Sequence, residues 1–195
     1  MDSSTSFRGN KRLIIGIAVI GIILFSSWFI PRKIMSIRPS DVIEIQNLIL
    51  DSVKTEQTAV ILPEPYRSNF NIPISDEVKR KANENIEDKF LKFYIPNSQI
   101  LKKMVKQSEG MIKAQETGNY RFADGGVAKY KNIKIYGYGN AATVSADIWV
   151  WNQALINNVI AHPEIGLHYQ FSVVRIGKSW VINDESSTVI PGEGA

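Results

Sequence analysis

Cysteine is absent from this sequence, and histidine occurs only twice, at His162 and His168. The missing thiols exclude disulfide bonds, thiolate nucleophiles and thiolate metal sites, and they are compatible with a location outside the bacterial cytoplasm. The sequence also lacks the HExxH, GxSxG and phosphate-loop motifs of metalloproteases, serine hydrolases and nucleotide-binding proteins. We therefore predict no metal site and no cofactor, and we expect a non-catalytic protein rather than an enzyme.

The positive charge of the chain surrounds one apolar run. The formal net charge is +4, but six basic residues flank that run: Arg8, Lys11, Arg12, Arg32, Lys33 and Arg38. Without these six, 17 of the 23 basic residues remain after position 38, against 18 of the 19 acidic ones, because only Asp2 lies earlier. The rest of the chain is thus close to neutral, which argues against a nucleic-acid partner, whereas the flanking charges suit anionic lipid headgroups.

The run from Leu13 to Ile30 contains 18 residues and no charge. At ~1.5 Å per residue, a helix of this length spans roughly 27 Å, enough for the apolar core of a bilayer. A cleaved signal peptide is the alternative, but no small-x-small cleavage site precedes Pro31, so we favour an uncleaved anchor. Three basic residues on each side leave the orientation tied. Because long C-terminal domains cross membranes largely regardless of charge, we expect a single-pass protein of the cell membrane with its domain outside.

Two stretches carry apolar residues at helical spacing. The first runs from Pro39 to about Glu56, and the second begins at Ser75 and continues to Phe93. Their apolar stripes are Val42, Ile45, Ile49 and Val53 in the first, and Val78, Ala82, Ile86, Phe90 and Phe93 in the second. A short third helix is expected from Ile100 to near Gly110.

Strands dominate the second half of the chain. Apolar and polar residues alternate from Ala141 to Trp151, so that Ala142, Val144, Ala146, Ile148 and Val150 share one face. Further strands are predicted at 127–138, 167–176 and 179–184, the last two joined by a tight turn at Gly177. The stretch from Asn152 to Gly166 is expected to form one or two helical turns over the mouth of the sheet.

We therefore predict an α+β fold: an N-terminal transmembrane helix, then about three helices packed on a curved antiparallel sheet of four to six strands. The predicted organisation is a polar tail (1–12), the membrane helix (13–30), a basic linker (31–38), the α+β domain (39–188) and a flexible tail (189–195).

The end of the sheet carries a resemblance to a known superfamily. An aromatic-rich strand, a turn with Gly177, and then Trp180, Ile182 and Asp184 resemble the closing hairpin of the nuclear transport factor 2-like superfamily, and Asn140 to Val144 resembles an earlier strand start. This resemblance implies a cone-shaped α+β roll over roughly residues 39–188. The superfamily includes isomerase-like enzymes and also membrane-anchored domains of type IV secretion and conjugation machines, and homodimers through the sheet are common in it.

The candidate site residues lie on the strands. Asp147, between aromatic and apolar neighbours, and His168 are the weak candidates for a catalytic base. An apolar ligand pocket is a second hypothesis, lined by Trp149, Trp151, Tyr169 and Phe171. The alternative for both histidines is a surface or structural role, which is more common. The alternative for the aromatic residues is the core, where aromatic residues of strands usually lie.

The function we expect is protein–protein contact within an envelope assembly related to secretion or conjugation, with the lipid bilayer and other envelope proteins as partners. The alternative is a ligand-binding or isomerase-like enzyme that uses the concave pocket of the sheet. A third possibility is a purely structural stalk, in which no residue outside the core matters for phenotype.

Overall fold

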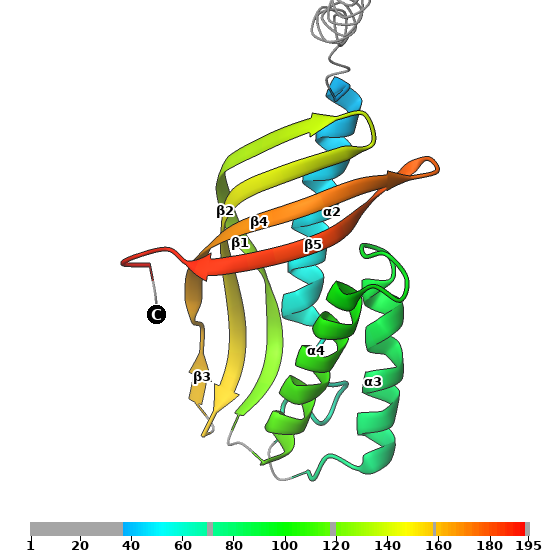
Figure 1. The fold of residues 1–195 in the computed structure, drawn as a ribbon. Coiled ribbons are helices and arrows are strands. Elements are labelled where there is room, and N and C mark those ends of the chain that lie inside the picture. The colour runs from blue at the N-terminus through cyan, green and yellow to red at the C-terminus, as the bar shows by residue number, and fades with distance from the viewer. Residues whose placement is uncertain (1–36, 70–71, 118–119, 158, 194–195) are drawn as a thin grey trace, which may run out of the picture. The chain divides into compact units, whose positions relative to one another are not determined.

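The computed structural model describes residues 37–69, 72–117, 120–157 and 159–193. Three helices come first: α2 (Pro39–Thr58), α3 (Asp76–Phe90) and α4 (Gln99–Thr117). Five strands follow: β1 (Tyr120–Tyr138), β2 (Ala141–Ile156), β3 (Val159–Ala161), β4 (Glu164–Ile176) and β5 (Ser179–Val189). The predicted class, an α+β domain of three helices packed on an antiparallel sheet, is confirmed for the described residues (Figure 1).

The strands form one antiparallel sheet in the order β1-β2-β4-β5, with the short β3 paired to the end of β2. Strand β1 bends at three register shifts, between Phe122 and Asp124, Val127 and Lys129, and Lys131 and Lys134. Extra residues of this kind increase the local twist, which curves the sheet around the helices. Asn132 lies in the last irregularity with a φ of 55°, a left-handed conformation that asparagine tolerates better than most residues.

The core lies between the helices and one face of the sheet. Ile45, Ile49 and Val53 of α2 are fully buried, as the spacing predicts, and so are Ile86 and Phe90 of α3. The sheet contributes the even-numbered residues of β2, the same five that the alternation places on one face. The opposite face, which carries Thr143, Ser145 and Asp147, is here called the outer face, and the described helices leave it open.

The third helix is longer than expected. It passes Gly110 and ends at Thr117, because Ile112 and Gln115 continue its buried stripe for two more turns. A glycine inside a helix weakens it without forbidding it, so the predicted stop near Gly110 was wrong.

The region after Trp151 is strand, not helix. Strand β2 continues to Ile156, and β3 turns back to pair Ile160 with Leu155 and Ala161 with Ala154. The prediction of helical turns over the sheet mouth was therefore wrong. The branched residues Ile156, Val159 and Ile160 favour the strand conformation.

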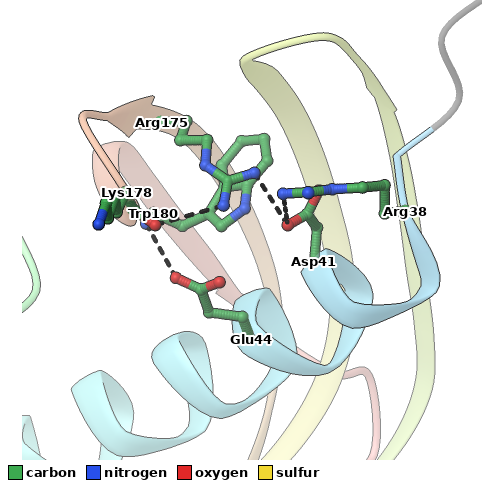
Figure 2. A network of polar contacts seen from close by, with 6 residues as sticks. All are labelled: Arg38, Asp41, Glu44, Arg175, Lys178 and Trp180. Carbon is green, nitrogen blue, oxygen red and sulfur yellow. Dashed lines mark hydrogen bonds and ion pairs between the residues drawn. The ribbon is translucent and has the colours of Figure 1, made fainter.

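A polar network joins the start of α2 to the β4–β5 hairpin (Figure 2). The carboxylate of Asp41, 4 % exposed, accepts hydrogen bonds from Arg38 at 3.0 and 3.1 Å and from Nη1 of Arg175 at 3.0 Å. The Arg38 hydrogen bond is the first cause that lowers the pKa of Asp41. Glu44 accepts the backbone N–H of Trp180 at 3.3 Å, so α2 is fixed to the hairpin at two points.

Among the described residues, no helix is long and apolar enough to cross a membrane. The predicted span from Leu13 to Ile30 and its flanking residues up to Lys33 lie outside those residues.

Replacing Gly110 by alanine should stabilise the domain. A Cβ at this position would meet no atom within 4 Å, and the residue lies inside α4. Because alanine loses less backbone entropy in a helix, we expect a gain of about 0.5–1 kcal/mol in the free energy of unfolding. Urea denaturation of the two proteins measures it, and an unchanged or lower midpoint would contradict the placement of Gly110 in an open part of the helix.

Candidate functional site

A cavity that opens to the surface beside the exposed Met111 lies between the end of α2, α4 and strands β1 and β2; it is called the interior cavity below. Its volume is about 330 Å³. The lining combines the apolar side chains Val60, Met104, Met111 and Phe122 with the polar side chains Glu56, Gln57, Gln107, Ser108 and Asn152. A hollow that combines apolar side chains with polar groups able to orient a ligand is a usual form of a small-ligand site.

Amide side chains hold the walls of this cavity in place. Gln115, which is fully buried, donates to the carbonyl of Val60 at 2.8 Å and accepts the N–H of Phe122 at 3.0 Å, so one side chain joins α4, the end of α2 and β1. Asn152 donates to Gln57 at 3.1 Å across the cavity rim. A Cβ on Gly125 would lie 2.7 Å from the Asn152 oxygen, so only glycine lets these groups approach.

Glu56, which lines the cavity, meets Glu185 of β5 at the hydroxyl of Tyr94, and we call these two glutamates the acidic pair. The hydroxyl of Tyr94 lies 2.6 Å from Oε2 of Glu185 and 3.2 Å from Oε1 of Glu56. Tyr94 is fully buried and Glu185 is 8 % exposed. Glu56 is partly exposed and lines the cavity, and its Oε1 contacts the buried tyrosine.

This arrangement keeps a proton on the acidic pair. Burial is the main cause that raises the pKa of Glu56 well above its usual range, and repulsion from Glu185 adds to it. Burial also raises the pKa of Glu185, against the hydrogen bond from Tyr94, which lowers it. A hydroxyl has one proton to donate, and the shorter contact assigns it to Glu185. The hydrogen bond between the two carboxyl groups also raises the pKa of Glu56 and lowers that of Glu185, so the proton belongs to Glu56 and is shared with Glu185.

The four aromatic residues predicted to line one pocket are divided between the faces of the sheet. Tyr169 and Phe171 belong to the buried core, where their rings stack at 5.4 Å. Trp149 instead lies under Lys129 and Lys131, whose ammonium groups are 4.7 and 5.6 Å from the ring centre, and Trp151 lies over Gly126. No described cavity is lined by all four, because residues of opposite parity on neighbouring strands face opposite sides.

The two residues proposed separately as bases form a pair. Asp147 and His168 are cross-strand neighbours, and Oδ1 of Asp147 lies 2.6 Å from Nδ1 of His168. Asn132 donates to the other carboxylate oxygen at 2.6 Å, and this bond, followed by that to His168, lowers the pKa of Asp147. The pair lies on the outer face, so neither residue reaches the interior cavity. His162 lies in the turn between β3 and β4, and among the described residues no three acidic or histidine side chains gather as a metal site requires.

Sequence reasoning missed the acidic pair. Glu56 falls near the end of an amphipathic helix, and Glu185 follows Asp184 in an ordinary strand, 91 residues after Tyr94. The alternation in β5 offers a signal, since Trp180, Ile182 and Glu185 are all buried once one register shift is allowed. That shift cannot be read from the sequence.

No protein-family model matches the chain, and no curated protein matches it. Among solved structures, the intermembrane space region of the chloroplast protein ARC6 is 11 % identical, over 75 % of this chain and 95 % of that one, with a TM-score of 0.50. A cystatin-like-fold protein of unknown function from Nostoc punctiforme PCC 73102 is 11 % identical, over 81 % and 97 %, with a TM-score of 0.44. A scytalone dehydratase-like protein from Novosphingobium aromaticivorans DSM 12444 is 13 % identical, over 77 % and 85 %, with a TM-score of 0.48. At these identities the first likeness supports the α+β fold alone.

The acidic pair makes stability depend on pH. The folded protein holds a proton that the unfolded chain releases near pH 4.5. The free energy of unfolding should therefore fall as the pH rises from this value through the raised pKa values, by up to about 1.4 kcal/mol per pH unit. Glu185→Gln retains an acceptor for Tyr94 and removes one charge, so its stability should fall less over the same range. Urea denaturation between pH 5 and 9 measures both proteins, with Glu84→Gln on an exposed helix face as the control, and parallel curves would contradict the shared proton.

Proposed function

We propose that this chain is a membrane-anchored interaction module, whose segment 13–30 crosses the cell membrane once and whose α+β domain contacts other proteins of a bacterial envelope assembly. The observation that carries the proposal is the open outer face of the sheet. Tyr136 and Tyr138 of β1 are 65 % and 57 % exposed there, next to a row of lysines in the same strand. Exposed tyrosines on a rigid element are common in protein interfaces, because they offer contact area at little entropic cost.

The edge of the sheet adds to this support. Strand β1 is an outer strand of the sheet, and its second half carries Lys129, Lys131 and Lys134. Lysines and bulges on an edge strand oppose pairing with a second identical edge, since like charges would meet. A different protein with acidic groups is therefore a better partner for this edge than a second copy. The related secretion or conjugation role follows from the superfamily resemblance and belongs to the same proposal.

A second candidate function rests on the interior cavity. Glu56 lines a hollow of about 330 Å³, and its pKa is raised well above the usual range, which suits a proton-transferring or ligand-binding site. This alternative retains the enzyme hypothesis but moves its acid–base residue from Asp147 or His168 to Glu56.

Photo-crosslinking in intact membranes tests the interaction module. A benzophenone amino acid in place of Tyr136, in the full chain, should form adducts with another envelope protein. The matched control replaces Lys81, whose side chain is 62 % exposed on α3. Adducts at Tyr136 and few at Lys81 are expected, by tenfold or more in yield. Equal yields at both positions, or adducts at neither, would contradict an interface on the outer face.

The Glu56→Gln variant separates the two candidate functions. It retains the size of the side chain and removes the transferable proton, so any turnover of a ligand bound in the cavity should fall by about 10²-fold or more. Ligand-observed NMR with a library of small apolar fragments first identifies a binder, and its conversion is then followed in both proteins. Crosslinking from Tyr136 should be unchanged in the variant, and a loss of crosslinking would show that the two surfaces are not independent.

A further inference from the structure

The outer face carries a line of polar side chains that the interaction module does not require. Asn132 donates to Asp147, Asp147 contacts Nδ1 of His168 at 2.6 Å, and Nε2 of His168 lies 3.4 Å from Oγ of Ser145. Each contact joins a different pair of strand positions on β1, β2 and β4. The side chain of His168 is 39 % exposed and that of Asp147 is 19 % exposed. A molecule in solution can therefore contact the histidine, while the carboxylate is largely covered by its neighbours.

The order of the contacts fixes the tautomer of His168. An ionised carboxylate accepts hydrogen bonds and cannot donate them, so Nδ1 must carry the proton it shares with Asp147. Nε2 of the neutral ring is then an acceptor, and it points toward the hydroxyl of Ser145. Carboxylate, imidazole and hydroxyl in this sequence are the groups that activate a serine nucleophile, and they are recognised by geometry rather than by motif.

The conformation of Asn132 belongs to the same arrangement. Its φ of 55° at the irregularity between Lys131 and Lys134 is a cost that a regular strand would avoid. In this backbone conformation, the side chain of Asn132 donates the 2.6 Å hydrogen bond that orients Asp147. Unfavourable backbone geometry that serves to orient a carboxylate is a feature of functional sites.

A hollow lies directly beside the serine. Its volume is about 400 Å³, and Ser145 shares its lining with Tyr136, Thr143, Gln170, Ser172 and the acidic Asp184. Gln170 is the cross-strand partner of Ser145, and it lines the same hollow, where its carboxamide offers a side-chain N–H donor. The hydroxyl and amide side chains in this lining suit a small polar ester better than a long acyl chain.

We propose that Ser145, His168 and Asp147 form a hydrolytic site for short-chain acyl esters on the outer face of the sheet. Oγ of Ser145 attacks the ester carbonyl carbon while its proton passes to Nε2 of His168. The bond to the leaving alcohol breaks, and that alcohol takes the proton from Nε2. Water then attacks the acyl-serine, again giving its proton to His168, and the carboxylic acid leaves as Ser145 regains its hydrogen. Asp147 and Asn132 are positioning residues.

The test uses the full chain in detergent with a fluorophosphonate probe, which bonds to an activated serine with loss of fluoride. Peptide mass mapping should find the adduct at Ser145, and Ser145→Ala should abolish it. His168→Ala should slow labelling by about 10²-fold or more, with partial recovery on adding free imidazole, which a purely structural histidine would not show. Asp147→Asn should slow labelling at least tenfold, and Asp147→Glu should restore part of the rate.

The matched control is Ser179→Ala, an exposed serine at the start of β5 away from the hollow, which should label at the wild-type rate. Circular dichroism of each variant establishes that it is folded. Hydrolysis of 4-nitrophenyl acetate should follow the same order of variants. Absence of an adduct at Ser145, or an adduct that forms equally fast in folded His168→Ala, would overturn the proposal. Neither result bears on crosslinking from Tyr136, so the two proposals fail separately.

Discussion

Burial of one face of β2 against α2 is the constraint on which the other placements depend. The sheet has two faces, and the three described helices cover the one that carries Val144, Ala146 and Ile148. Strand residues alternate, so this choice also decides which side chains meet solvent. A shift of one residue in the register of β2 would bury Asp147 without a partner and expose the core residues. The polar network around Asp41 then fixes the height of α2 against the β4–β5 hairpin.

The acidic pair is a consequence of this packing. Bringing α2, the segment after α3 and β5 together places Glu56 and Glu185 on the same tyrosine hydroxyl. Ionising both buried carboxyl groups would cost free energy through desolvation and mutual repulsion, so the two groups share one proton. The same proton gives the interior cavity its one chemically distinctive group.

The two faces of the sheet therefore offer different chemistry. The inner face and the helices enclose an acid in a partly apolar cavity, where a ligand would exclude water. The outer face presents tyrosines, lysines and an oriented His168 to solvent, where a partner protein or an ester could approach without rearrangement of the core. Strand β2 contributes to both faces through alternate residues, so a substitution on one face need not disturb the other.

The sequence alone determined the local features, because they depend on spacing along the chain. The period-two pattern of Ala141 to Trp151, the stripe of Ile45, Ile49 and Val53, and the turn at Gly177 are all local signals. Tertiary structure decided the length of α4, where burial of Ile112 and Gln115 outweighs the weak signal of Gly110. Tertiary structure also decided that Asp147 contacts His168 and that Tyr94 contacts two glutamates. Register shifts and long-range packing set these contacts, and the spacing of residues along the chain reveals neither.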